Sequence, residues 1–402
     1  MANLSGGSPR MTIEGGPAPA TSLRDSTSTD LAMMRAALAL ARRGLGTTWP
    51  NPSVGCVIVN HGHVVGRGWT GRGGRPHGER EALRRAGAAA QGATAYVTLE
   101  PCSHWGQTPP CADALIAAGL RRVVVALEDP DPRVAGSGIE GLRKAGLAVE
   151  RGLCAAEAAE LNAGFLQRVR LGRPLVTLKL ATSLDGRIAT ASGESRWITG
   201  SAARERAHLL RATHDAILVG TETVLADDPQ LTCRLPGLAG RSPLRVVLDR
   251  QLRIPPSARL LADARQVPTW IVTLGSSDPA RQELFRNAGI EVIAAEPDAA
   301  GLIDLSSALG LLGDRGLTRL LVEGGGRLAA ALLRADLVDR LVWFHAPLVL
   351  GSDGIPAVAG LDPNGLAGMP RFEQLATEFV GEDVMTVFRA RRLAEDGRPE
   401  QR

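Results

Sequence analysis

The chain has 402 residues, of which 44% are hydrophobic and 22% are charged, and its formal net charge is +4 at pH 7. This length is sufficient for two ordinary domains with full-sized cores. The composition is that of a globular protein, and no apolar run reaches the roughly 18 residues that a membrane span needs. Because the charge is small and the arginines are spread along the chain, the basic balance is weak support for nucleic-acid binding.

The cysteines are thinly spaced and odd in number, at positions 56, 102, 111, 154 and 233. Because the sequence also lacks a signal peptide, this pattern argues against a disulfide framework and predicts that the protein is located in the reducing cytoplasm. Residues 1–28 are rich in Gly, Ser, Thr and Pro, which predicts a flexible tail. Met11 within it is an alternative start to Met1.

Helices and strands are expected to alternate from residue 29 onward. Thr29 and Asp30 can cap a first helix that ends at Gly44. The segment 53–69 then predicts a hairpin whose turn carries His61 and His63. These histidines suit either a metal site or an exposed polar turn, and the turn is favoured because no third ligand lies nearby in the sequence.

A new series of strands and helices begins after a predicted helix and the segment "LGRP". This alternation predicts two α/β units with helices packed on their sheets. We expect the following organisation: a tail at 1–28, a first domain at 29–153, a linker at 154–172, a second domain at 173–392 and a C-terminal tail at 393–402.

The segment "PHGE" places His77 and Glu79 two residues apart at the start of a predicted helix. Both side chains can face one cavity from that first turn, the imidazole toward a metal and the carboxylate toward a metal-bound water. Cys102 follows a predicted strand further along the chain. A histidine, a glutamate and a Pro-Cys in this order are typical of zinc deaminases, in which the glutamate moves protons without binding the metal.

Cys102 and Cys111 both follow prolines, and we expect both to lie near helix N-termini, where the dipole favours the thiolate that zinc binds. With His77 they would leave the fourth tetrahedral position for water, as catalytic zinc sites do. Zinc deaminases usually carry two residues between their cysteines, whereas eight residues intervene here. Cys102 and His104 therefore remain a rival ligand pair.

Four segments resemble the deaminase half of the bifunctional riboflavin biosynthesis deaminase-reductases: "TTWPNPSVGCVIV", "PHGE", "TLEPCSHWGQTPPCADALIAAG" and "EDPDPRVAGSGIEGLRKAG". That family has the same long loop between its cysteines. The resemblance implies a cytidine-deaminase-like α/β/α fold for the N-terminal domain. It also implies zinc ligation by His77, Cys102 and Cys111, catalytic proton transfer by Glu79, and a substrate pocket lined by Asn51 and His104.

The chain departs from this family pattern at four positions. Gly78 stands where alanine is usual, Glu81 where histidine is common, Gln107 where a basic residue is usual, and Asp131 where asparagine is usual. The exchange at Gly78 is conservative for metal binding. The missing basic residue at Gln107 leaves open how this loop meets an anionic substrate.

In the second half, "EGGGRLA" follows a predicted strand and opens a helix, where backbone N–H groups can bind phosphate. Gly324, Gly326 and Ala329 fit a loose dinucleotide-binding pattern, although such turns are also ordinary strand-to-helix connections. Arg211 and Arg234 are candidate phosphate ligands through paired N–H donors.

Together with "LKLATSLDGRIATASGESRWITG" and "LRATHDAILVGTETVLADDPQLTCR", this turn resembles the reductase half of the same family, whose fold is similar to dihydrofolate reductase. The resemblance implies ribose phosphate binding by Ser195, Arg211, Leu231, Arg234 and Glu323. It implies NADPH binding by Ala181, Trp197, Thr223, Asp227, Gly325, Gly326, Arg327, Leu328, Ala329, Ala330 and Ala331.

Lys179 and Asp185, in "KLATSLDG", match motif positions for which we expect a local role in ordering the pocket and in proton transfer. Lys179 is notable because Lys144 is the only other lysine. Arg250 stands near the expected NADP ribose, where serine is often found. It would either pair with the cofactor's 2′-phosphate or face solvent.

The resemblance implies a cytoplasmic, bifunctional enzyme of riboflavin biosynthesis. Its first step is the zinc-dependent hydrolytic deamination of 2,5-diamino-6-ribosylamino-4(3H)-pyrimidinone 5′-phosphate. Its second step reduces the ribosyl group with NADPH to give 5-amino-6-ribitylamino-uracil 5′-phosphate. The implied partners are this small-molecule substrate and further copies of the chain, without nucleic acid or membrane.

Two alternatives of other classes remain open. A zinc deaminase of nucleic acid would need a basic or aromatic surface, and the aromatic content of 3% disfavours it. A binding module with a structural zinc would need a fourth protein ligand, which His104 could supply.

Overall fold

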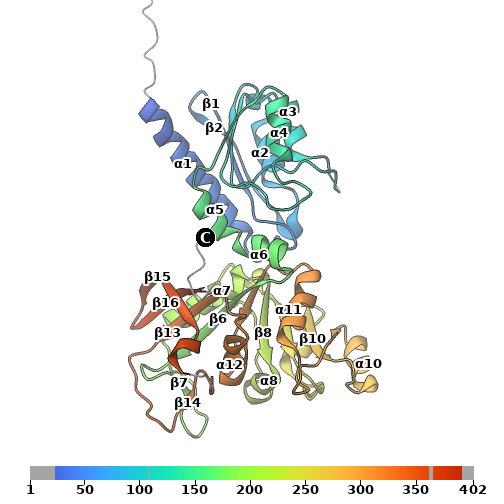
Figure 1. Ribbon diagram of the computed structural model, residues 1–402, viewed down its shortest axis with the longest axis vertical. Helices are drawn as coiled ribbons and strands as arrows, with labels where there is room; N and C mark the ends of the chain where they lie inside the picture. Colours follow the sequence, from blue (N-terminus) through green and yellow to red (C-terminus); the bar gives the residue numbers. More distant parts are fainter. Residues whose placement is uncertain (1–22, 107, 362–364, 392–402) are drawn as a thin grey trace, which may run out of the picture.

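Two large β-sheets with helices packed on them dominate the computed structural model, which describes residues 23–106, 108–361 and 365–391 (Figure 1). The first sheet is built by residues 55–151 and the second by residues 175–391. Helices α5 and α6 lie between the two halves in Figure 1. Residues 1–22 and 392–402, which include most of the two predicted tails, lie outside the described residues.

The first sheet has the strand order β2-β1-β3-β4-β5, with β1 antiparallel to its neighbours and β3, β4 and β5 parallel. The predicted hairpin is confirmed, because His61 and Gly62 take the positive φ values of 47° and 77° that its tight turn requires. Both His61 and His63 are exposed. The strands are β1 (Gly55–Asn60), β2 (His63–Trp69), β3 (Thr94–Val97), β4 (Arg122–Val125) and β5 (Ala148–Arg151).

Helices cover both faces of this sheet because successive strand residues point to opposite sides. Val57, Tyr96 and Val124 pack with α1 and α5, whereas Cys56 and Ile58 pack with α2, α3, α4 and α6. The helices are α1 (Leu23–Ala41), α2 (Gly78–Ala86), α3 (Cys111–Ala117), α4 (Ser137–Lys144), α5 (Ala155–Leu161) and α6 (Ala163–Leu171).

Helix α1 begins at Leu23, so the prediction that Thr29 and Asp30 cap it is wrong. Asp30 lies inside the helix, where its carboxylate accepts hydrogen bonds from Tyr96 Oη at 2.6 Å and Arg122 Nη1 at 3.0 Å. The bond from Arg122 also lowers the pKa of Asp30. This contact with β3 and β4 outweighs the local preference of aspartate for a helix start.

Residues 154–172, for which one helix was expected, form α5 and α6 on either side of Asn162. Asn162 Oδ1 accepts the backbone N–H of Ser53 at 2.9 Å. Leu161 packs on the α1 side of the first sheet, and Phe165 packs on the opposite side. These helices therefore belong to the packed structure around the first sheet.

The second sheet has the order β11-β10-β9-β8-β12-β6-β13-β16-β15, and its neighbouring strands are parallel except that β16 is antiparallel to both β13 and β15. β15 and β16 follow the last strand that the sequence predicted. A separate pair is formed by β7 and β14. The strands are β6 (Leu175–Thr182), β7 (Arg187–Ala189), β8 (Ala216–Gly220), β9 (Leu244–Leu248), β10 (Thr269–Leu274), β11 (Glu291–Ala295), β12 (Arg319–Val322), β13 (Arg340–His345), β14 (Ile355–Pro356), β15 (Arg371–Val380) and β16 (Asp383–Arg391).

Apolar clusters lie on both faces of this sheet as well. One includes α11 and α12, and another includes α8, α9 and α10. Across the described part of the chain, every helix is too short or too polar to cross a membrane. The helices of this half are α7 (Ser201–Thr213), α8 (Thr221–Asp227), α9 (Arg259–Ala262), α10 (Pro279–Asn287), α11 (Leu305–Asp314) and α12 (Gly326–Arg334).

Candidate active sites

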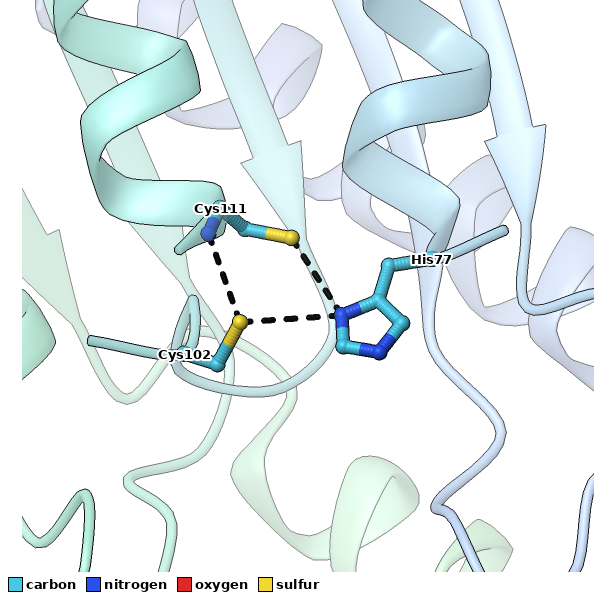
Figure 2. Close-up of side chains that lie close together, drawn as sticks. All are labelled: His77, Cys102 and Cys111. Atoms are coloured by element: carbon cyan, nitrogen blue, oxygen red, sulfur yellow. Dashed lines mark hydrogen bonds between the residues drawn. The ribbon is translucent and has the colours of Figure 1, made fainter. Parts of the chain in front are cut away.

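His77, Cys102 and Cys111 converge on one point in the first half (Figure 2). His77 immediately precedes α2, and its Nδ1 lies 3.3 Å from Cys111 Sγ and 3.6 Å from Cys102 Sγ. The three donor atoms all lie within 4.8 Å of one another. Within residues 23–106, 108–361 and 365–391, no other group of three or more His, Cys, Asp or Glu side chains is arranged to hold a metal ion.

The two cysteines differ in their backbone positions. Cys111 is the first residue of α3, as expected for a thiolate stabilised by a helix N-terminus. Cys102 lies in the loop after β3 and does not begin a helix itself. Its sulfur instead accepts the backbone N–H of Cys111 at 3.3 Å, because the loop folds back onto the start of α3.

The sulfur atoms suit a divalent cation. A hydrogen bond from the Cys111 thiol, together with one from His77, lowers the pKa of Cys102 to about 4. The pKa of Cys111 is raised beside that thiolate and by burial. Cys111 can therefore become a second thiolate here only if a positive charge lies between the two sulfur atoms and offsets their repulsion. Two cysteines and one imidazole are a common donor set for zinc, so the residues present fit the ion.

Glu79 lies beside this group in the first turn of α2 and is only 3% exposed. Burial raises the pKa of Glu79 to about 7. Its Oε2 is buried and has no hydrogen-bond partner in the described structure. A buried carboxylate oxygen without a partner is costly, so this atom is poised for a group that enters the site.

A cavity of about 580 Å³ opens onto these residues. His77, Glu79 and Cys102 line it, as do the two predicted pocket residues, Asn51 and His104. His104 lies outside the metal-binding group, and its Nδ1 is buried without a partner among the described residues. The structure therefore separates His104 from the ligand set and places it in the wall of the cavity.

The four departures from the family pattern have different structural settings. A Cβ on Gly78 would come 2.6 Å from the carbonyl oxygen of Val54, so this backbone leaves no room for alanine. Glu81 pairs with Arg84 and Arg85 on the surface of α2. The other two positions are Asp131, which lines the cavity and whose carboxylate is bound by Arg133, and Gln107, which lies outside the described residues.

The second half contains a cavity of about 490 Å³ between β6, α7 and the residue after β12. Seven of the predicted site residues line it together: Lys179, Ala181, Ser195, Trp197, Arg211, Arg234 and Glu323. An adjoining cavity of about 440 Å³ shares Ser195, Trp197, Arg211 and Arg234, and it is also lined by Asp227 and Leu231.

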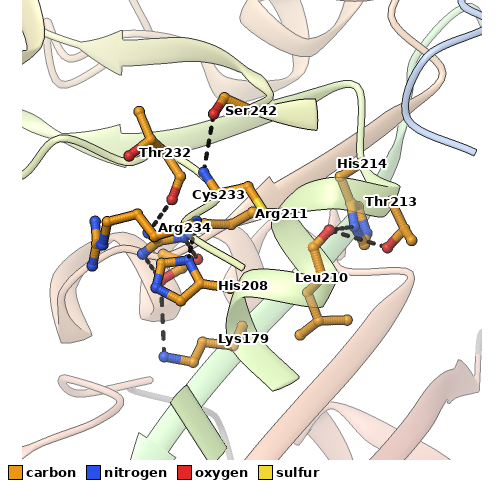
Figure 3. Close-up of polar contacts among 11 residues, drawn as sticks. Lys179, His208, Leu210, Arg211, Thr213, His214, Thr232, Cys233, Arg234 and Ser242 are labelled. Carbon is orange, nitrogen blue, oxygen red and sulfur yellow. Dashed lines mark hydrogen bonds and ion pairs between the residues drawn. The ribbon is translucent and has the colours of Figure 1, made fainter. Parts of the chain in front are cut away.

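Arg211 and Lys179, which are labelled in Figure 3, form an ion network with Glu323 in this region. Arg211 donates from Nε to Glu323 Oε1 at 2.8 Å and from Nη2 to Oε2 at 3.0 Å. Lys179 Nζ lies 3.8 Å from the same Oε2. Burial alone would raise the pKa of Glu323, but the charges of Arg211 and Lys179 lower it to about 2. Burial lowers the pKa of Lys179.

The remaining predicted residues of this half do not line these two cavities. Thr223 lies in α8, and the run 325–331 forms the start of α12. A Cβ on Gly326 would come 2.6 Å from the carbonyl oxygen of Pro356, so the chain passes close to this turn. Asp185 accepts the N–H groups of Leu350 and Gly351. Arg250 donates to the carbonyl of Gly301 at 3.0 Å.

The sequence interpretation missed several residues that line these cavities, among them His208 and Arg204. His208 lies three residues before Arg211 on α7 and lines the same cavity. Its pKa is lowered by burial and by the charges of Arg211 and Arg234. Arg204 lies over the ring of Trp197, with 4.3 Å between its Cζ and the ring centroid. The helical spacing of Arg204, His208 and Arg211 was the available signal, because such residues share one face.

Comparison with known proteins matches both halves separately. The model of the cytidine and deoxycytidylate deaminase zinc-binding region matches residues 27–127. The model of the RibD C-terminal domain matches residues 174–386.

Full-length relatives match both halves at once. The chain is 47% identical to riboflavin biosynthesis protein RibD of Escherichia coli K12 over 364 residues, which cover 87% of this chain and 96% of the relative. It is 43% identical to the RibD protein of Bacillus amyloliquefaciens, over 87% of this chain and 94% of the relative. The structure of Acinetobacter baumannii RibD matches with a TM-score of 0.82 and 41% identity, over 91% of this chain and all of that one.

The fold and the two sites define a class: a zinc-dependent deaminase joined to an NADPH-dependent reductase in one chain. This confirms the expected cytidine-deaminase-like domain and the reductase domain. The chain belongs to the RibD family and is a bifunctional enzyme of riboflavin biosynthesis. A deaminase of nucleic acid is not favoured, because the similarity extends through both halves.

Proposed function

We propose that the first site deaminates 2,5-diamino-6-ribosylamino-4(3H)-pyrimidinone 5′-phosphate and that the second reduces the ribosyl group of the product. The observation that carries the proposal is the buried, unpartnered Glu79 Oε2 beside His77, Cys102 and Cys111 in an accessible cavity. A relative from Thermotoga maritima, 33% identical, is described as a diaminohydroxyphosphoribosylaminopyrimidine deaminase and 5-amino-6-(5-phosphoribosylamino)uracil reductase, which supports this substrate.

In the deaminase site, His77, Cys102 and Cys111 would hold the zinc ion. Bound zinc would lower the pKa of a water molecule, so that hydroxide is available as the nucleophile near neutral pH. Glu79 takes a proton from the attacking water and delivers it to the departing amine. A pKa of about 7 suits a group that must both accept and donate a proton. Asn51 and His104 orient the pyrimidine from the cavity wall.

In the reductase site, bound NADPH would supply the hydride that reduces C1′ of the ribosyl group. The residues proposed to contact it are those of the sequence analysis: Ala181, Trp197, Thr223, Asp227 and the run 325–331. Ser195, Arg211, Leu231 and Arg234 would hold the ribose phosphate. For Glu323 we propose another role than phosphate binding. Its carboxylate accepts two hydrogen bonds from Arg211 and so fixes the position of that guanidinium group.

The hydride addition breaks the bond between C1′ and the ring oxygen, and that oxygen must take a proton. We infer that Lys179 donates this proton, because it lines the cavity and burial lowers its pKa. Asp185 orders the segment after β13, since its carboxylate accepts the N–H groups of Leu350 and Gly351.

The test is an assay of the purified chain with the diamino substrate. Without NADPH, we expect one ammonia released for each substrate consumed. After NADPH is added, one NADPH is oxidised for each ammonia released. The absence of ammonia release by the zinc-loaded chain would contradict the proposal.

We also propose the domain division at residues 153 and 173. The end of β5 at Arg151 and the start of β6 at Leu175 support it. Within this division, residues 154–172 contain the helices α5 and α6, which pack on the first sheet. A cytoplasmic location is supported by the free thiols of all five cysteines, two of which are the proposed zinc ligands.

We propose that the enzyme is a homo-oligomer in which β15 meets another copy. β15 is an edge strand of the second sheet, and most of its residues are exposed. Phe379 is 84% exposed. An open edge with exposed apolar side chains favours strand pairing. Light scattering should give a multiple of the chain mass for the wild type and a monomer for Phe379→Asp. A monomeric wild type would contradict the proposal.

A further inference from the structure

Helix α6 contributes a cation to the deaminase cavity. Phe165, Arg168 and Val169 line the same 580 Å³ cavity as His77 and Glu79. Arg168 is half-buried. Part of the cavity wall is therefore built by residues that follow the first sheet in the sequence.

The reductase half holds this arginine in place. Arg168 Nε donates to the carbonyl oxygen of Gly313, near the end of α11, at 2.7 Å. Among the described residues, neither Nη1 nor Nη2 of Arg168 has a hydrogen-bond partner, and no carboxylate forms an ion pair with it. With Nε fixed, the two terminal nitrogens form a preorganised fork, which suits a phosphate group.

The other arginines of the cavity, Arg133 and Arg75, are bound to residues of the first half. Arg133 donates to both carboxylate oxygens of Asp131, which neutralises its charge locally. Arg75 donates from Nη1 to Thr108 Oγ1 at 2.8 Å and so holds the loop between the two cysteines. Arg75 also precedes the zinc ligand His77 by two residues. The phosphate is separated from the reacting pyrimidine by the ribose, so a cation on α6, which carries none of the proposed zinc ligands, suits it.

A second part of the cavity wall also rests on the reductase half. The ring of Trp49 packs edge-on against Trp270, with 6.4 Å between centroids. Pro50, which lines the cavity, lies so close to Gly316 that a Cβ there would come 2.8 Å from the proline Cβ. The segment 313–316 therefore supports the cavity through both Arg168 and Pro50.

We propose that Arg168 binds the 5′-phosphate of the deaminase substrate and that the reductase carbonyl at Gly313 positions it. The inference rests on the proposed function, which makes the substrate a phosphate ester. Arg168 would then supply the positive charge that the loop residue Gln107 does not carry. The deaminase site is then complete only when the reductase half is folded against it.

The test compares Arg168→Met in the full chain on two substrates, the diamino substrate and its dephosphorylated form. We expect kcat/KM for ammonia release from the phosphorylated substrate to fall about 10- to 100-fold, mainly through KM. For the dephosphorylated form we expect less than about a twofold change. Zinc content and the reductase activity should equal those of the wild type. Arg170→Met is the matched control, because Arg170 is exposed on the same helix.

Three results would overturn the inference. An equal loss of activity on both substrates would make Arg168 a structural residue. A selective loss on the phosphorylated substrate in Arg75→Met, with none in Arg168→Met, would place the phosphate at Arg75. Failure of the wild type to deaminate the phosphorylated substrate would overturn the proposed function itself. Arg168→Lys should retain part of the selectivity for phosphate, since it keeps the charge and loses the fork.

Discussion

Replacement of Glu323 by glutamine tests whether a buried ion network builds the reductase cavity. The wild-type side chain is 12% exposed and pairs with Arg211 Nε at 2.8 Å and with Lys179 Nζ at 3.8 Å. Glu323→Gln keeps the size of the side chain and leaves two buried cations without their anion. Removal of one partner from a buried pair costs about 3–5 kcal/mol. For a domain of roughly 200 residues, that loss lowers Tm by on the order of 10 °C.

The effect should depend on pH with a defined sign. The ordinary pKa of the Glu323 carboxyl is 4.5, and folding lowers it to about 2. The ionised form therefore stabilises the folded state at pH values above 4.5, and this contribution is lost as the pH falls toward 2. The difference in Tm between wild type and Glu323→Gln should be complete at pH 7 and shrink as the pH falls below 4.5.

Scanning calorimetry and the two activity assays would check this prediction. NADPH oxidation should fall because Arg211 loses its bidentate partner, while ammonia release should keep its wild-type KM. Glu222→Gln is the control: Glu222 pairs with Arg253 on the surface, and both side chains are exposed, so its loss should cost less than about 1 kcal/mol. A Glu323→Gln protein with the Tm and the reductase KM of the wild type would refute the reasoning.

Three further outcomes concern the first site. Glu79→Gln should abolish ammonia release while NADPH oxidation with the deaminated intermediate continues, and ammonia release at the wild-type rate would exclude proton transfer by Glu79. Metal analysis should show zinc lost from Cys111→Ser and retained by His104→Ala, whose deaminase turnover falls; equal zinc loss in both would make His104 a ligand. Chelation of zinc should stop deamination, leave the reductase active and be reversed by added zinc, whereas loss of both activities would contradict two independent sites.

The metal-binding group could be predicted from the sequence because its chemistry demands particular residue types at the starts of helices. His77 and Glu79 lie in one helical turn, so their shared direction follows from local structure. The position of Cys102 could not be predicted in the same way. Its sulfur contacts the first residue of α3, nine residues later in the sequence. This contact depends on how the intervening loop folds, which the sequence pattern does not specify.

Features that depend on packing between distant segments were missed or misjudged. Asp30 lies inside α1 because Tyr96 and Arg122 bind its carboxylate. The place of Arg168 in the deaminase cavity depends on a carbonyl of the reductase half, 145 residues further along the chain. The hairpin of β15 and β16 was not predicted, since its first strand is an exposed edge without a clear burial pattern.

The most direct test of two independent sites on one chain combines two variants. Glu79→Gln and Lys179→Met should each fail to oxidise NADPH when supplied with the diamino substrate, the first because it makes no intermediate and the second because it cannot reduce it. An equimolar mixture of the two should restore NADPH oxidation, with ammonia released in equal amount. A mixture as inactive as either variant alone would contradict the assignment of deamination and reduction to separate sites.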